Sequence, residues 1–137
     1  APAATAADPG GAADRLRILL ADDNTDAADS LATLLEAGGH TVCTVYDGRE
    51  ALRLAPTFAP DLAFLDIGMP GMDGYETARA LRALPQLDGL RLVALTGWGA
   101  AEDRARSREA GFDHHLLKPA SPEQLAQVLA GAAQGGG

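Results

Sequence analysis

Short apolar runs alternate with segments of helical periodicity along this chain, and this alternation restricts the fold more than any other feature. Five runs have the length and residue types of buried strands, and they cover residues 17–21, 41–45, 62–65, 90–96 and 114–117. A helical segment follows each run after a short connection. Strands joined in this way lie parallel, so helices must cover both faces of their sheet. The sequence therefore predicts an α/β fold built on a five-stranded parallel sheet.

Capping and breaking residues mark the predicted helix boundaries. Asn24 or Thr25 caps the first helix. Asp47 opens the second helix, which is expected to end at Pro56 or Pro60. The remaining helices are expected over residues 74–84, 100–110 and 122–132.

Two segments of biased composition flank a single predicted domain, which covers residues 15–133. Residues 1–14 are rich in Ala, Pro and Gly without an apolar period, and we expect a flexible linker there. Residues 134–137 are expected to be a flexible tail. The linker lacks the basic start and apolar centre of a secretory signal. Because the chain also lacks an initial Met, we expect that the domain was cut from a longer protein.

Charge and composition argue against several classes of function. The net charge is −8, so the phosphate backbone of a nucleic acid would repel the chain, and direct nucleic-acid binding is not expected. The single cysteine, Cys43, excludes an internal disulfide. No apolar stretch approaches the roughly 20 residues that a membrane-spanning helix needs, so a direct membrane partner is not expected either.

Four of the predicted strands end in side chains that can carry chemistry. Asp22 and Asp23 follow the first strand, Asp66 ends the third, Thr96 ends the fourth and Lys118 follows the fifth. Parallel strands with right-handed crossovers bring these ends to one edge of the sheet. Lys118 is also the only lysine, against ten arginines. The sequence therefore predicts that three carboxylates, a hydroxyl and an ammonium group meet at this edge.

Three crowded carboxylates need a cation, because each pair at about 5 Å repels by about 3 kcal/mol at an effective dielectric constant of about 20. Oxygen ligands with room for water favour Mg²⁺, or else Mn²⁺, over zinc. A metal ion, an ammonium group and a hydroxyl around one carboxylate form a phosphoryl-transfer site. In such a site Asp66 would be the nucleophile.

Four motifs, in this order and spacing, resemble the receiver domain of two-component response regulators: LLADDN, LDIGMPGMDG, ALTGWG and HHLLKP. The resemblance covers about residues 16–132. Around Asp66, Thr96 and Lys118 the sequence is similar to the receivers attached to hybrid histidine kinases. It implies a flavodoxin-like (βα)5 fold with strand order 2-1-3-4-5. It also implies a cytoplasmic signalling domain, not an enzyme, that accepts a phosphoryl group from a histidine kinase or a histidine phosphotransferase.

The resemblance assigns the acidic residues to a phosphoacceptor and its metal ion. Asp66 is expected to accept the phosphoryl group. Asp23 is expected to bind Mg²⁺ directly, and Asp22 to act mainly through water. Asp66 itself and the backbone carbonyl of Gly68 would complete the protein ligands.

The resemblance places the switch on the last two strands. Thr96 would bond a phosphoryl oxygen, and Lys118 would pair with the phosphoryl group. His115 stands three residues before the lysine, where the family usually has Tyr or Phe. We expect its ring to move with Thr96, and a solvated strand histidine is the alternative. The helix around residues 102–109, the fifth strand and the last helix would form an output or homodimer face, unless that helix simply presents a solvated surface.

Two other functions remain open at this point. A phosphohydrolase of the aspartyl-phosphate type would turn over an external phosphoester at Asp66. Against it, the chain has no obvious substrate cap, and no second acid follows Asp66 immediately. A pseudo-receiver would bind partners without phosphate, but all five of the polar residues at the strand ends are present.

Overall fold

The computed structural model of the chain describes residues 15–69, 71–87, 89–96, 108–117 and 121–135. The strands are β1 (Arg17–Ala21), β2 (Thr41–Val45), β3 (Leu62–Asp66), β4 (Arg91–Thr96) and β5 (His114–Leu117). The helices are α3 (Thr25–Ala37), α4 (Gly48–Phe58), α5 (Gly74–Arg82), the 3-10 turn η1 (Pro85–Leu87) and α7 (Pro122–Gly135). All five predicted strands are present. Among the predicted helices, the one over residues 100–110 lies mostly outside the described residues.

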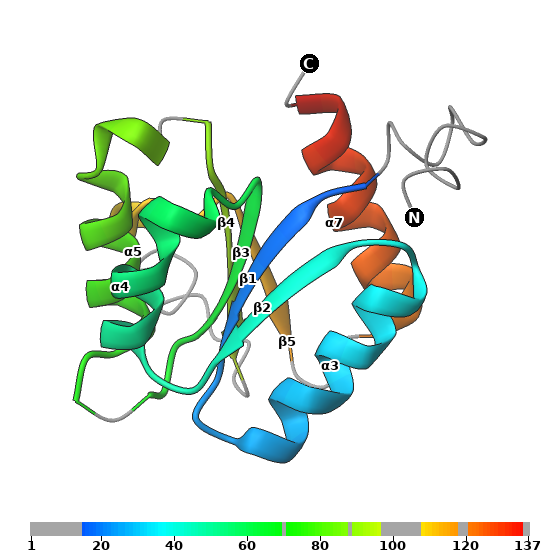
Figure 1. Ribbon diagram of the computed structural model, residues 1–137, viewed down its shortest axis with the longest axis horizontal. Helices are drawn as coiled ribbons and strands as arrows, with labels where there is room; N and C mark the ends of the chain where they lie inside the picture. Colours follow the sequence, from blue (N-terminus) through cyan, green and yellow to red (C-terminus); the bar gives the residue numbers. More distant parts are fainter. Residues whose placement is uncertain (1–14, 70, 88, 97–107, 118–120, 136–137) are drawn as a thin grey trace.

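The five strands form one parallel sheet in the order β2-β1-β3-β4-β5, as expected (Figure 1). Its centre is β3, which pairs with β1 on one side and β4 on the other and is buried along its whole length. In the register between β3 and β4, Asp66 lies opposite Leu95, so Thr96 is one residue further along the neighbouring strand. The phosphoacceptor candidate and the hydroxyl candidate therefore reach the same edge of the sheet.

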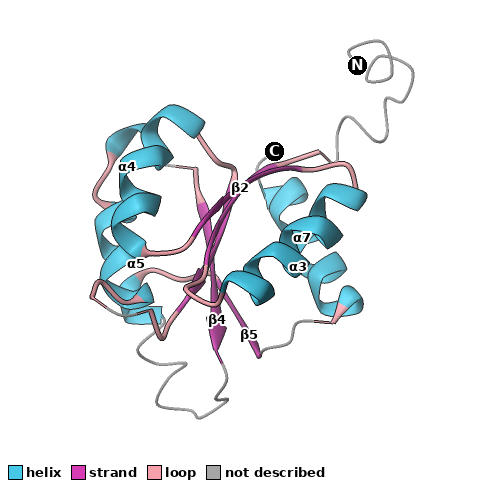
Figure 2. Ribbon diagram, turned by 60° about the horizontal axis from the view of Figure 1, so that its bottom comes forward, coloured by secondary structure: helices cyan, strands magenta, loops and turns pink. Residues whose placement is uncertain are grey.

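Two helical layers cover the sheet (Figures 1 and 2): α4 and α5 lie against one face, and α3 and α7 against the other. Strand β1 shows why both faces are apolar. Leu19 and Ala21 belong to the core cluster under α4 and α5, whereas Ile18 and Leu20 belong to the cluster under α3 and α7. Because successive side chains of a strand point to opposite faces, a continuous apolar run is what a doubly covered strand requires.

The helix boundaries follow the predicted caps with two refinements. Asn24, and not Thr25, caps α3, because its side chain accepts a hydrogen bond from the Ala27 N–H. Helix α4 continues through Pro56 and ends at Phe58, so Pro60 is the proline that lies beyond its end. Pro56 occupies the last turn, where its missing N–H removes only one backbone hydrogen bond.

The last helix is longer than predicted, since α7 extends to Gly135 instead of ending near residue 132. Ala132, Ala133 and Gln134 are good helix formers, and the helix ends at Gly135, a residue type that commonly ends helices. The limits of 15 and 133 for the domain remain a prediction. Among the described helices, none is long and apolar enough to cross a bilayer.

Candidate functional site

Three central strands bring polar side chains to the carboxyl edge of the sheet. Asp22 directly follows β1, Asp66 is the last residue of β3 and Thr96 is the last residue of β4. All three side chains belong to buried residues, with exposed fractions of 2% for Asp22, 7% for Asp66 and 4% for Thr96. Buried polar groups in such a row need a chemical explanation, because burial without compensation is costly.

Asp22, Asp23 and Asp66 form what we call the acidic cluster. One carboxylate oxygen from each residue lies within 4.8 Å of the other two. Asp23 is exposed, and the other two carboxylates are buried. The sequence argument for carboxylates that share one edge is therefore confirmed in its geometry for these three residues.

Backbone N–H groups orient the two buried carboxylates of the acidic cluster. The Asn24 N–H donates to Asp22 Oδ1 at 2.9 Å, and the Gly68 N–H donates to Asp66 Oδ1 at 3.1 Å. In both cases the donor is two residues after the aspartate, as in an Asx turn. These contacts were not predicted from the sequence, although an aspartate that ends a strand before a turn is a recognisable signal for them.

Hydrogen bonds to neighbouring strands hold the backbone around each aspartate. The Asp22 N–H donates to the Val45 carbonyl at 3.2 Å, at the end of β2. The Ile67 N–H donates to the Leu95 carbonyl at 3.0 Å, which extends the pairing of β3 with β4 by one residue beyond Asp66. The acidic cluster thus rests on a backbone fixed by four strands, β1 to β4.

The acidic cluster fits a hard divalent cation. Three carboxylates offer oxygen ligands at mutual distances that one ion can span, and Mg²⁺ and Mn²⁺ prefer such ligands. Without a cation the cluster is repulsive, because each pair of charges at about 5 Å costs about 3 kcal/mol at an effective dielectric constant of about 20. The role of the Gly68 carbonyl as a further ligand remains a prediction.

The other predicted site residues lie on or after β4 and β5. Thr96 pairs with Leu117 in the register between β4 and β5, so Lys118 is the next residue in sequence after this pair. Lys118 itself lies outside the described residues. His115 pairs with Ala94 and is half-buried, so it is only partly exposed to solvent. Its movement with Thr96 remains a prediction.

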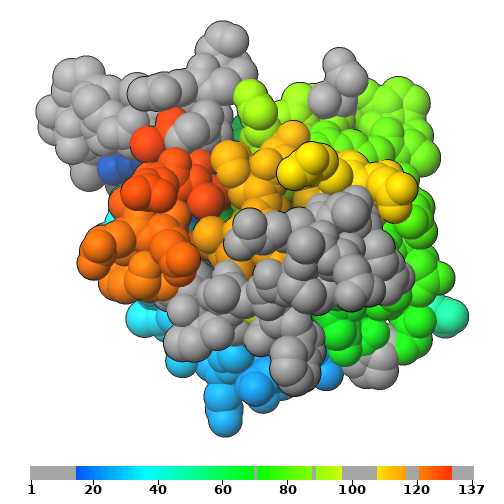
Figure 3. Space-filling model, turned by 180° about the vertical axis from the view of Figure 1, so that it is seen from behind, coloured from blue at the N-terminus to red at the C-terminus, as the bar shows by residue number. Residues whose placement is uncertain are grey.

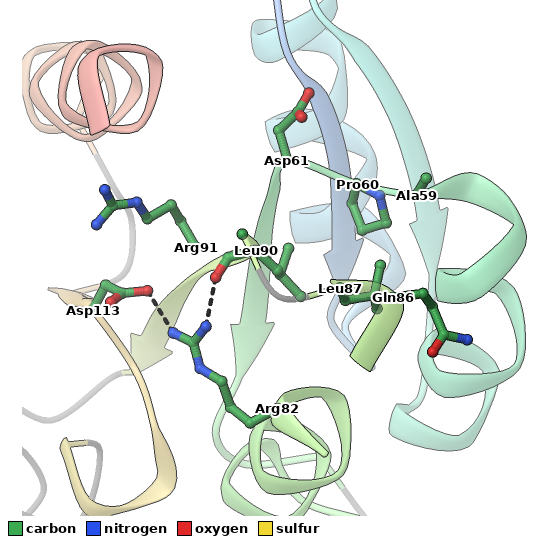
Figure 4. A pocket seen from close by; sticks show the side chains of 10 residues that line it. Ala59, Pro60, Asp61, Arg82, Gln86, Leu87, Leu90, Arg91 and Asp113 are labelled. Atoms are coloured by element: carbon green, nitrogen blue, oxygen red, sulfur yellow. Dashed lines mark hydrogen bonds and ion pairs between the residues drawn. The ribbon is translucent and has the colours of Figure 1, made fainter. Parts of the chain in front are cut away.

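A cavity of about 580 Å³ lies at the opposite, amino edge of the sheet (Figure 4). Arg82 is held there by hydrogen bonds at 2.6 Å to the Leu90 carbonyl and the Asp113 carboxylate. It also donates to the Gly111 carbonyl. These contacts tie α5 to the starts of β4 and β5, which is a structural role. Neither the acidic cluster nor Thr96 lines this cavity.

Comparison with known proteins agrees with this geometry. The family pattern described as the response regulator receiver domain matches residues 18–130. A 14.6 kDa uncharacterized protein of Leptolyngbya boryana is 36% identical over 115 residues, which cover 84% of this chain and 88% of that protein. The transcriptional regulatory protein PrrA of Mycobacterium tuberculosis is 40% identical over 103 residues, or 75% of this chain, and the match spans 43% of PrrA.

A solved structure shows the same arrangement of elements. It is the signal receiver domain of a signal transduction histidine kinase from Syntrophus aciditrophicus. Its sequence is 34% identical, its TM-score is 0.79, and the match covers 88% of this chain and 91% of that one.

Proposed function

Because this chain belongs to the response regulator receiver family, we propose that it accepts a phosphoryl group on Asp66 as one step of a phosphorelay. The observation that carries the proposal is the acidic cluster: a buried Asp66 at the end of β3, with the Asp22 and Asp23 carboxylates within 4.8 Å. Receivers of response regulators interact with histidine kinases or histidine phosphotransferases. A phosphohistidine of such a partner is the proposed donor.

The described residues support a direct displacement at phosphorus. A carboxylate oxygen of Asp66, whose side chain the Gly68 N–H orients through Oδ1, is the proposed attacking atom. The P–N bond to the donor imidazole breaks as the new O–P bond forms, and the electron pair returns to the imidazole. Thr96 supplies a hydroxyl donor one residue along β4 from the Asp66 pair. Lys118 is proposed to pair with the transferred group.

Mg²⁺ or Mn²⁺, held by Asp22, Asp23, Asp66 and the Gly68 carbonyl, would offset the negative charge of the phosphoryl group and the carboxylates when bound. The exposure of Asp23 gives such an ion access from solvent. Backbone N–H groups orient two of its proposed ligands, Asp22 and Asp66.

Several finer features are also proposed. The chain acts in the cytoplasm, where kinases of this class present their phosphohistidines. It is a signalling domain and not an enzyme with an external substrate, and its similarity to a kinase-attached receiver supports an origin in a hybrid histidine kinase.

A homodimer face is proposed over residues 102–109, β5 and α7. Figure 3 shows the described part of that face, where residues 108–117 lie beside α7.

Phosphorylation by a small donor tests the proposal. The chain is incubated with acetyl phosphate and MgCl₂, and intact mass spectrometry measures the product. We expect one added phosphoryl group, no addition in EDTA and no addition in Asp66→Ala. Asp61→Asn is the matched control, because Asp61 is an exposed acid just before β3 at its other end, and we expect normal labelling.

Three results would contradict the proposal. Undiminished labelling of Asp66→Ala would assign the phosphoryl group to another residue. Repeated turnover of a phosphoester such as p-nitrophenyl phosphate would instead favour the phosphohydrolase, which the comparisons do not support. Metal binding without any phosphorylation would favour a pseudo-receiver.

A further inference from the structure

Two helices next to the acidic cluster begin with the same pair of residues, an aspartate cap followed by glycine. Asp47 caps α4 and Gly48 is its first residue, while Asp73 caps α5 and Gly74 is its first residue. Neither glycine has the positive φ angle that favours this residue. Since glycine is a weaker helix former than alanine, backbone conformation does not explain its presence at these positions. The space around each glycine does.

Gly74 lies against the peptide that joins the phosphoacceptor to the next residue. A Cβ atom on Gly74 would lie 2.7 Å from the Asp66 carbonyl oxygen, 2.8 Å from Ile67 Cα and 3.0 Å from the Asp66 carbonyl carbon. The Gly74 N–H also donates to the Ile67 carbonyl at 3.1 Å. All the obstructing atoms belong to the backbone, so no side-chain rotation can make room. A side chain at this position must displace the Asp66–Ile67 peptide.

That peptide controls the geometry of Asp66. Its N–H, from Ile67, bonds the Leu95 carbonyl of β4, and the next N–H, from Gly68, orients the Asp66 carboxylate. A shift of a few tenths of an ångström at this peptide therefore moves Asp66 relative to β4. It also disturbs the hydrogen bond from the Gly68 N–H to Asp66 Oδ1.

Gly48 supports the same loop from the neighbouring helix. A Cβ atom on Gly48 would overlap Thr77 Oγ1 and lie 2.9 Å from the Met72 carbonyl oxygen. Met72 belongs to the segment between β3 and α5. Thr77 is fully buried, and its hydroxyl donates to the Asp73 carbonyl at 2.8 Å. The two glycines thus allow the first turns of α4 and α5 to enclose the chain that leaves Asp66.

We propose that Gly74, supported by Gly48, is a positioning residue for the acidic cluster. By admitting helix α5 to within contact of the Asp66–Ile67 peptide, Gly74 sets the geometry in which Asp66 binds the metal ion and accepts the phosphoryl group. This inference rests on the proposed function. It predicts that Gly74 affects metal affinity and phosphorylation rate beyond its effect on folding.

The test compares Gly74→Ala with Gly89→Ala. Gly89 is exposed, and a Cβ atom there would meet nothing within 4 Å, so it controls for the glycine-to-alanine change itself. Three quantities are measured: the dissociation constant for Mn²⁺ by calorimetry, the labelling rate by acetyl phosphate at saturating Mg²⁺, and the urea midpoint of unfolding. For Gly74→Ala that still unfolds cooperatively, we expect Mn²⁺ affinity and labelling rate each to fall about tenfold. Gly89→Ala should match the unsubstituted chain.

A second pair of variants decides the question if Gly74→Ala does not fold. Gly48→Ala should weaken Mn²⁺ binding, and Gly48→Ala with Thr77→Ala should recover part of the loss, because the second change removes the overlapping hydroxyl. A purely structural role would lower the urea midpoint of these variants without changing their Mn²⁺ affinity.

The outcomes separate this inference from the proposed function. If the unsubstituted chain neither binds Mn²⁺ nor becomes labelled, the proposed function fails. If the unsubstituted chain does both, and folded Gly74→Ala or Gly48→Ala stays within about twofold of it in both measurements, the positioning role is overturned.

Discussion

The Asp23→Asn substitution removes one negative charge from the acidic cluster with almost no change of shape. One oxygen from each carboxylate lies within 4.8 Å of the others. At this distance and an effective dielectric constant of about 20, each pair repels by about 3 kcal/mol. Asp23 is exposed, so water and salt screen its share, and we expect a net relief of about 1–2 kcal/mol without metal.

Little opposes this gain in the part of the chain that the structure describes. There, backbone N–H groups bond the Asp22 and Asp66 carboxylates, but no hydrogen bond or ion pair to the Asp23 side chain occurs. Asp23→Asn should therefore raise the melting temperature in EDTA by about 3–6 °C. With saturating Mg²⁺ the order should reverse, because the unsubstituted chain binds the ion more tightly and gains more stability from it.

Differential scanning calorimetry at low and high salt measures both effects. Glu109→Gln is the control, because it also removes one exposed negative charge but lies just before β5 at the amino edge of the sheet. The gain of Asp23→Asn should exceed that of Glu109→Gln and shrink as salt is added. A lower melting temperature for Asp23→Asn in EDTA, or a gain equal to that of the control, would refute the repulsion argument.

Three further predictions concern the surroundings of the site. Asp73→Ala removes the capping box of α5 and should cost about 1–2 kcal/mol in urea unfolding, and an unchanged midpoint would contradict this. Burial raises the pKa of the Cys43 thiol, so iodoacetamide should alkylate the native chain more slowly than the urea-unfolded chain. The hydrogen bond from the Tyr46 hydroxyl to Asp29 raises the pKa of Tyr46 above its ordinary value of 10.0. The stabilisation from this hydrogen bond should therefore be complete below pH 10.0 and should disappear as the pH rises through the raised pKa of Tyr46. Tyr46→Phe should lose this pH dependence of stability in urea titrations. An unchanged pH profile in Tyr46→Phe would exclude the role of this hydrogen bond.

Local chemistry explains why the sequence predicts the elements so well. The continuous apolar run of β3 indicates a strand covered on both faces, and its buried residues confirm this. The caps of α4 and α5 act within three residues, as the bond from the Glu50 N–H to Asp47 shows. Signals of this range can be read directly from the residues that make them.

The order of the strands is a different matter. Periodicity predicts five parallel strands but does not say which of them are neighbours, and the order 2-1-3-4-5 came from the resemblance to receivers. Likewise, the residues alone place Asp22 and Asp66 at one edge of the sheet, but not within 4.8 Å of each other. That distance depends on β1 pairing directly with β3.

The sequence by itself therefore determined the elements, their parallel direction and the chemical types at the carboxyl edge. The tertiary structure decided the contacts that bring them together: the Ile67 N–H on the Leu95 carbonyl, the Asp22 N–H on the Val45 carbonyl and the approach of Gly48 to Thr77. The physical reason is range. Periodicity and caps act over a few residues along the chain, whereas these contacts require segments far apart in sequence to pack at distances that vary by tenths of an ångström.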